Sequence, residues 1–450
     1  PIFSFVSGSS VFIAARLLMF GVFTGLSIIV GLLFWEVRRS WIAIVAPLIL
    51  LFLPMPSDKL LEIRPDTLTT LFFFLGLLFQ MRGMNLESKN HSKKDLLFSG
   101  ICYGLSLFVS QKMVLFLVIP IGGYVGWGIM NMREKLISFQ RYIAMSVWGL
   151  VGFFSMIAIL FGYFLSIGAY PLIWYSLTTL GFEAGKLGNI FATPIQFYFL
   201  PNDIYYGVYG YHLGYILNLI CWMCGILVCI VRIFSPYVPH RKQGVWQEII
   251  LGALLLLSIS MYIWFWPMKH AQYLIPSAVL IAYYCADFVY IIWERMKQKW
   301  MAACLFLILF LSVLFLFVRG YQIVTMPKLW WRNEGDLKKL ERILQVIPKT
   351  EPIFDMVGLT VYYPQPYYIA VFPVGQVTSV ISLSVPSLIS KLEETNTKFI
   401  YIGYQARFQT LSHIDQEYIQ THFSPMGDGS LLVRNDIVDT YKNLWSQEQK

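Results

Sequence analysis

The chain has 450 residues, of which 57% are hydrophobic, 17% aromatic and only 13% charged, and its mean hydropathy is +0.62. Soluble domains carry about 25% charged residues, so this composition excludes a soluble globular enzyme and also a disordered chain. The 34 basic and 25 acidic residues give a net charge of +9. What this charge means depends on where the charged residues lie along the chain.

Long apolar runs fill the first two thirds of the chain. A membrane-crossing helix needs about 20 mostly apolar residues. The sequence predicts ten such segments: 11–35, 41–54, 67–81, 96–110, 113–130, 142–165, 206–233, 249–266, 273–293 and 301–318. The second, third and fourth are short, so we expect them to extend into their flanks or to have their ends buried by the protein.

The basic residues of the connecting loops predict the orientation of these spans. One set of alternate loops holds fifteen basic residues and the other set holds five, which places the first set in the cytoplasm. The two basic loops that flank residues 96–130 lie on the same face of the membrane only if this stretch crosses the membrane twice. The sequence therefore predicts a tight break at Gln111 and Lys112, with Lys112 near the outer surface.

The last part of the chain is a different kind of sequence. Residues 319–450 hold 13 basic and 13 acidic residues, with short strand-like runs at 353–355, 398–402 and 431–433 and helix-like runs at 335–346, 386–394 and 414–422. This alternation predicts a small α/β domain on the extracytoplasmic face, following a transmembrane domain over residues 1–318. The net charge of +9 then lies wholly in the membrane part, where it orients the spans, so a nucleic-acid partner is excluded.

No cofactor and no tightly bound metal are expected in this part of the protein, while the need for a divalent metal stays open. The six cysteines all lie in apolar stretches, and no cluster of acidic residues has metal-ligand spacing. Asp287 lies deep in the ninth span and is interpreted as a packing partner.

The outer end of the third span carries the first candidate site. Pro65 suits the first turn of a helix, and Asp66 then faces the positive end of the helix dipole. Arg64 next to an exposed helix N-terminus is suited to bind a phosphate, and Glu62 lies close by in sequence. A capped helix start beside a solvated loop explains Asp66 equally well.

Other outer cations extend this candidate site. Lys112 lies in the predicted break, and Arg16 lies near the outer end of the first helix. An alternative explanation for both is that a long basic side chain extends to the membrane surface without binding a ligand. Lys269 and His270 are adjacent in an outer turn, and Tyr273 follows His270 by one helical turn, so all three can face one pocket. A lone histidine is more often structural than catalytic. Together the outer cations point to a lipid phosphate.

Four stretches resemble the multi-spanning GT-C glycosyltransferases, in particular the group related to protein O-mannosyltransferases and lipid A aminoarabinose transferases. They are residues 10–18, 63–66, 104–112 and 270–276. The resemblance implies an enzyme that moves a sugar from a polyprenyl-phosphate carrier to an acceptor outside the cytoplasmic membrane, with inversion. The carrier phosphate would be the leaving group, stabilised by cations, and a carboxylate would be the general base.

In the resembled family the main catalytic acid lies in the first external loop. That loop and the span before it would precede Pro1, so the chain is expected to be an N-terminally truncated enzyme. Asp66 and Glu62 are then supporting carboxylates only. The expected partners are the lipid-linked sugar donor and membrane lipids, whereas the sugar, the acceptor and the oligomeric state stay open. Two alternatives also stay open: a transporter or flippase of lipid-linked glycans, and a non-catalytic membrane assembly protein.

Overall fold

The computed structural model of the chain describes residues 8–53, 62, 64–85, 92–175, 206, 212–234, 244–265, 271–329, 334–367, 387–403 and 405–447. The chain divides into two compact units. Of the described residues, the membrane unit contains those within 15–329. The second unit contains residues 8–14 and those within 334–447. By this division, residues 10–14 of the first helix are assigned to the second unit and residues 15–38 to the membrane unit.

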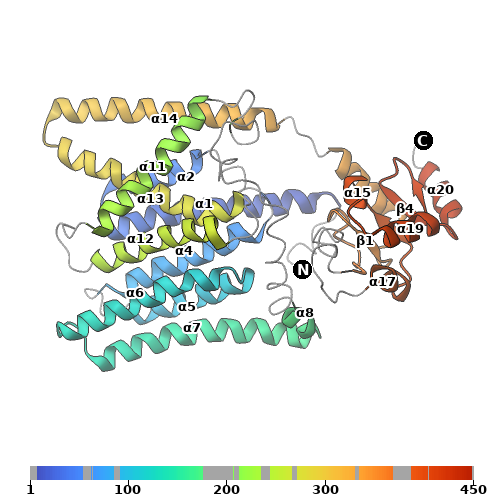
Figure 1. The fold of residues 1–450 in the computed structure, drawn as a ribbon, viewed down its shortest axis with the longest axis horizontal. Coiled ribbons are helices and arrows are strands. Elements are labelled where there is room, and N and C mark those ends of the chain that lie inside the picture. The colour runs from blue at the N-terminus through green and yellow to red at the C-terminus, as the bar shows by residue number, and fades with distance from the viewer. Residues whose placement is uncertain are drawn as a thin grey trace. The chain divides into compact units, whose positions relative to one another are not determined.

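The membrane unit consists of apolar helices that coincide with the ten expected spans (Figure 1). They are α1 (Ser10–Arg38), η1 (Trp41–Ile44) with α2 (Val45–Phe52), α4 (Pro65–Gly83), α5 (Ser92–Val109), α6 (Met113–Arg133), α7 (Phe139–Ser166), α11 (His212–Phe234), α12 (Gly244–Ser260) with η5 (Met261–Phe265), α13 (Ile275–Met296) and α14 (Trp300–Leu329). The short helices α8 (Tyr170–Tyr175) and η6 (Ala271–Leu274) lie between spans.

Among the described residues, seven helices are long and apolar enough to cross a membrane. The other three expected spans are shorter or more polar: the first is formed by η1 together with α2, the second by α4 and the third by α5. These are the same three segments that we expected from the sequence to be short. The predicted break after α5 is confirmed, because α5 ends at Val109 and α6 begins at Met113. The polytopic helical fold class is therefore confirmed.

Two features hold the membrane unit together. Helix α13 lies in its centre, since all residues from Ile275 to Asp287 are buried. Helices α5 and α7 approach closely because glycines face each other's backbone. A Cβ atom on Gly100 would overlap the carbonyl oxygen of Gly149, and one on Gly152 would overlap that of Leu97. Small residues allow such close helix contacts where the hydrophobic effect between helices is weak.

The second unit is a small α/β domain, as the sequence predicted. Its sheet has the order β1-β2-β4-β3, formed by β1 (Ile353–Asp355), β2 (Phe399–Tyr401), β4 (Leu431–Arg434) and β3 (Phe423–Met426). Strands β1 and β2 are parallel, and the other two pairs are antiparallel. The helices are α15 (Glu334–Val346), α17 (Leu388–Glu394), α18 (Gln405–Phe408), α19 (His413–His422) and α20 (Val438–Gln447).

Alternate strand residues face two separate cores in this domain. Ile400 belongs to a core that includes residues of α17 and α19. Its neighbour Phe399 belongs to the other core, which includes residues of α15 and α20. This alternation is the period-2 pattern of a strand covered on both faces.

Candidate functional site

Three helix starts bring polar side chains together at one end of the membrane unit. Helix α4 begins with Pro65 after Arg64, whose backbone is extended (φ −136°, ψ 148°) and whose side chain caps nothing. Asp66 lies in the first turn of α4, where the helix dipole favours a negative charge. The hydroxyl of Thr70 donates to the Asp66 carbonyl at 2.7 Å and so reinforces this turn.

Lys112 is the centre of this group. It lies in the tight turn before α6, where the chain reverses between two apolar helices. Its Nζ atom lies 3.8 Å from Oδ1 of Asp66 and 3.7 Å from the centre of the Tyr273 ring. The Lys112 side chain is 38% exposed and that of Asp66 16%. We call Asp66, Lys112 and Tyr273 the lysine cluster.

A small pocket contains the lysine cluster. It is lined by Asp66, Thr69, Thr70, Ser110, Lys112, Met113, Phe116, Gln272, Tyr273 and Pro276. Reciprocal hydrogen bonds support its wall: the Thr69 hydroxyl donates to the Ser106 carbonyl at 2.6 Å, and the Ser106 hydroxyl donates to the Thr69 carbonyl at 2.9 Å. These two bonds join α4 to α5. The pocket thus combines a cation, a carboxylate, an aromatic face and several hydroxyls at one end of apolar helices.

Two of the sequence-predicted cations lie elsewhere. Arg64 forms an ion pair with Glu62, and both side chains are partly exposed; neither residue lines the pocket. Arg16 is exposed on α1 and does not line it either. Lys269 and His270 lie outside the described residues. Of the eight candidate residues, the structure therefore brings together Asp66, Lys112 and Tyr273.

Sequence reasoning did not select the neutral polar lining. Thr69, Thr70, Ser110 and Gln272 face the same pocket. Thr69 and Gln272 are buried, with 3% and 7% of their surface exposed. A signal was present: hydroxyl residues at 67, 69 and 70 are unusual in the first turns of an apolar helix. The hydroxyl of Thr67 is buried and has no hydrogen-bond partner among the described residues.

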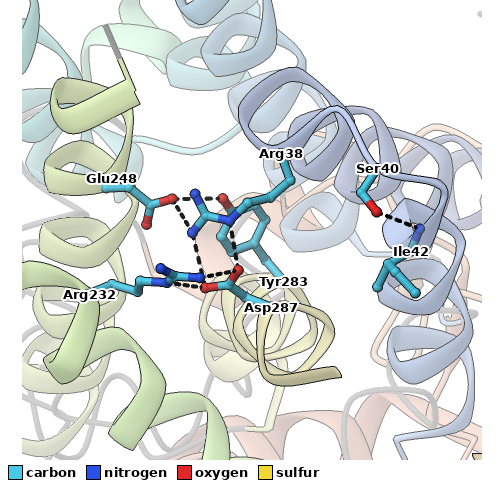
Figure 2. Close-up of polar contacts among 7 residues, drawn as sticks. All are labelled: Arg38, Ser40, Ile42, Arg232, Glu248, Tyr283 and Asp287. Atoms are coloured by element: carbon cyan, nitrogen blue, oxygen red, sulfur yellow. Dashed lines mark hydrogen bonds and ion pairs between the residues drawn. The ribbon is translucent and has the colours of Figure 1, made fainter. Parts of the chain in front are cut away.

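A second polar group is buried within the membrane unit, and Figure 2 shows its geometry. Asp287 of α13 is fully buried and accepts two hydrogen bonds from each of two arginines. Arg38 Nε and Nη2 lie 2.7 and 3.0 Å from its oxygens, and Arg232 Nε and Nη2 lie 2.6 and 3.0 Å away. Such bidentate pairs are the strong form of the ion pair.

Glu248 completes this group. Arg38 Nη2 lies 2.5 Å from Glu248 Oε1, and the Tyr283 hydroxyl donates to the same oxygen at 3.2 Å. The group joins α1, α11, α12 and α13 and contains two cations and two anions. We call these five residues (Arg38, Arg232, Glu248, Tyr283 and Asp287) the arginine cluster.

The arginine cluster corrects the assignment of two basic residues to the cytoplasmic loops. The fifteen loop residues predicted from the sequence include Arg38 and Arg232. In the structure these two lie in the last turns of α1 and α11 and point into the protein. Thirteen loop residues remain against five, so the same orientation is still predicted. The contacts of Asp287 agree with its interpretation as a packing partner.

No group of three or more His, Cys, Asp or Glu side chains within the described residues is arranged to hold a metal ion. The described residues of the lysine cluster offer one carboxylate and one lysine, a set suited to an anion more than to a metal.

No model of a known protein family matches the chain, and no curated protein matches it. Among solved structures, the chain is similar to the Archaeoglobus fulgidus oligosaccharyltransferase, crystallised in complex with Zn and sulfate. The two sequences are 12% identical and the TM-score is 0.45. The alignment covers 96% of this chain and 63% of the oligosaccharyltransferase, so this chain spans less than two thirds of that protein.

Proposed function

We propose that the protein is an integral-membrane glycosyltransferase that moves a sugar from a polyprenyl-phosphate donor to an extracytoplasmic acceptor. The single observation that carries this proposal is the position of Lys112. Its ammonium lies beside a carboxylate and an aromatic ring in a polar pocket at the end of apolar helices. A lipid phosphate is an anion held at this level by its own apolar tail.

Electrostatics favours a phosphate at this place. The pocket lies at the N-termini of α4 and α6, where the helix dipoles place partial positive charge. The separation of 3.8 Å between Lys112 and Asp66 is longer than the ~2.7–2.9 Å of a charge-assisted hydrogen bond. A phosphate oxygen at the usual distance would therefore approach Lys112 more closely than Asp66 does.

The proposed reaction breaks the bond between the anomeric carbon and the phosphate oxygen. The acceptor hydroxyl attacks the anomeric carbon from the opposite face, which inverts its configuration, and a carboxylate takes up the hydroxyl proton. The phosphate leaves with the electron pair of the broken bond. Lys112 stabilises the charge that develops on it. Lys269, which lies outside the described residues, stays a sequence-predicted phosphate-binding residue.

Asp66 has a supporting role in this proposal. Its Oδ1 lies 3.8 Å from the ammonium of Lys112, and the centre of the Tyr273 ring lies 3.7 Å from the same ammonium. Asp66 and Tyr273 are thus positioning residues. The orientation predicted from the loop charges places the pocket and the α/β domain on the extracytoplasmic face of the cell membrane.

The proposal is tested by turnover in proteoliposomes made from the purified full-length protein. Polyprenyl-phosphate sugars with labelled sugars are supplied with a membrane-fraction acceptor, and release of polyprenyl phosphate is measured. The wild type is expected to release it, and Lys112→Ala is expected to be slower by about 100-fold, the scale of losing one transition-state donor. The control is Lys93→Ala, which removes an exposed lysine at the start of α5.

Two outcomes would contradict the proposal. Equal turnover by Lys112→Ala and the wild type would remove Lys112 from the reaction. Movement of the intact lipid-linked sugar across the membrane without release of polyprenyl phosphate would favour the transporter alternative.

A further inference from the structure

An apolar groove is lined by residues of α4, α5, α6 and α7. Its volume is about 450 Å³. Its rim consists of exposed apolar side chains, Ile121 and Val125 on α6 and Leu150 and Phe154 on α7. The groove is separate from the lysine cluster, because the two share no lining residue.

The floor of the groove offers no unsatisfied polar atom to a ligand. The Tyr103 hydroxyl donates to Gln80 Oε1 at 2.7 Å, and Gln80 Nε2 donates to the Pro120 carbonyl at 2.7 Å. The Ser146 hydroxyl donates to the Tyr124 hydroxyl at 3.3 Å. Since the protein itself satisfies these groups, the groove fits a ligand that is apolar along its whole length.

The length of the groove selects the kind of apolar chain. Its lining extends from Tyr142 to Phe154 on α7, and the twelve residue-to-residue rises between them span ~18 Å of helix. One leaflet of the hydrocarbon core is ~15 Å thick. A single fatty-acyl tail therefore fills the groove, whereas a polyprenyl chain of many isoprene units extends beyond it.

The end of the groove at the α6–α7 hairpin indicates the headgroup. There the rings of Tyr124 and Tyr142 stack at 5.3 Å and join the two helices. Arg141 does not line the groove itself but directly precedes Tyr142, which does; one of its terminal nitrogens is buried without a hydrogen-bond partner among the described residues. Arg133 and Lys135 lie in the same hairpin. An arginine with an unused donor is suited to a phosphate, and basic residues near the bilayer attract anionic lipids.

We propose that this groove binds one acyl tail of an anionic glycerophospholipid, with its phosphate at Arg141. The site is separate from the proposed sugar-transfer site. The bound acyl tail covers the groove between α6 and α7 and thereby completes the packing of the four helices α4, α5, α6 and α7.

The test measures lipid binding by native mass spectrometry of the purified full chain after controlled addition of lipid. The probes are phosphatidylglycerol, phosphatidylcholine with the same tails, and undecaprenyl phosphate. We expect tighter binding of phosphatidylglycerol than of phosphatidylcholine. Arg141→Gln should remove most of this preference, about tenfold in affinity, whereas Arg295→Gln, which changes an exposed arginine in the last turn of α13, serves as the matched charge control.

A second pair of variants tests the groove itself. Gly149 lines it, and a Cβ atom there has ordinary contacts, so Gly149→Leu fills the groove with little strain at Cβ. Gly122 is exposed on α6 with nothing within 4 Å of its Cβ position, so Gly122→Leu is the matched control. Gly149→Leu should weaken phosphatidylglycerol binding at least tenfold, and Gly122→Leu should leave it unchanged.

Photocrosslinking of the wild type makes the test independent of how the variants fold. Phosphatidylglycerol with a diazirine in its tail should label peptides of α6 and α7 at the groove. Labelling elsewhere only, or wild-type affinity in Gly149→Leu, would overturn the proposal. An equal loss of affinity for phosphatidylglycerol and phosphatidylcholine in Arg141→Gln would also overturn it. So would stronger competition for the labelled site by undecaprenyl phosphate than by phosphatidylglycerol.

Discussion

The ammonium of Lys112 lies 3.7 Å from the centre of the Tyr273 ring. The two residues are far apart in sequence, one in the turn before α6 and the other in η6 before α13. A cation that lies on an aromatic face is attracted by the ring quadrupole, and Asp66 attracts the same ammonium from 3.8 Å. The position of Lys112 is thus determined by three helix starts together.

Tyr273→Leu should therefore weaken the lysine cluster, whereas Tyr273→Phe should preserve it. The aromatic face remains in phenylalanine, and a cation–π contact is worth about 0.5–2 kcal/mol. We expect the KM for the lipid-linked donor to rise between about twofold and 30-fold in Tyr273→Leu and to change less than twofold in Tyr273→Phe. Donor titrations at saturating acceptor measure this, and equal KM values for the two variants would contradict the role of the ring.

Asp66→Asn should lower both the KM for the donor and kcat, for two different reasons. The variant removes a negative charge beside the proposed phosphate, so the donor binds more tightly and its KM falls several-fold. Lys112 loses the carboxylate that positions it, so kcat falls about tenfold. Initial rates over a range of donor concentrations separate the two effects. The control is Glu134→Gln at the other end of α6, and an unchanged donor KM in Asp66→Asn would place Asp66 away from the phosphate.

The arginine cluster should contribute strongly to stability. Asp287→Asn leaves two buried arginines with one remaining carboxylate, Glu248, and removing one partner of a buried pair costs about 3–5 kcal/mol. Equilibrium unfolding in mixed detergent micelles measures the loss. The control is Glu294→Gln, which breaks an exposed pair with Lys297 and should cost at most about 1 kcal/mol. Similar losses for the two variants would contradict the importance of the buried network.

The glycines between α5 and α7 provide a test of packing. A Cβ atom on Gly152 would overlap the backbone carbonyl of Leu97, so Gly152→Ala should destabilise the protein by about 1–3 kcal/mol. Gly162 lies on the same helix with nothing within 4 Å of its Cβ position. Gly162→Ala should be neutral or slightly stabilising, because alanine favours a helix. The same unfolding measurement compares them, and equal stabilities would refute the close contact.

Much of the fold was predictable because the signal is local. Each apolar run is recognised from its own residues alone. The break at Gln111 and Lys112 was predicted because the basic loops on either side of it must lie on the same face of the membrane. The lysine cluster was partly predictable for a similar reason: Asp66, Lys112 and Tyr273 lie near helix starts on the same predicted face. Strand β3 was missed, since Phe423–Met426 contains Pro425 and lacks the alternation of a strand.

The arginine cluster was not predictable from local pattern. An arginine at the end of an apolar run looks the same in sequence whether it faces water or a buried carboxylate. Arg38 is 249 residues from Asp287, and Arg232 is 55 residues from it. Only the arrangement of α1, α11, α12 and α13 shows that their charges neutralise each other.

The most direct test of the central claim is whether Lys112 binds the phosphate of a polyprenyl lipid. Affinities of undecaprenyl phosphate and of the uncharged undecaprenol are measured for the wild type, Lys112→Ala and Lys93→Ala in nanodiscs. We predict that the wild type and Lys93→Ala prefer the phosphate by at least about tenfold, as expected for a charge-assisted contact, and that Lys112→Ala loses this preference. An unchanged preference in Lys112→Ala would contradict the claim.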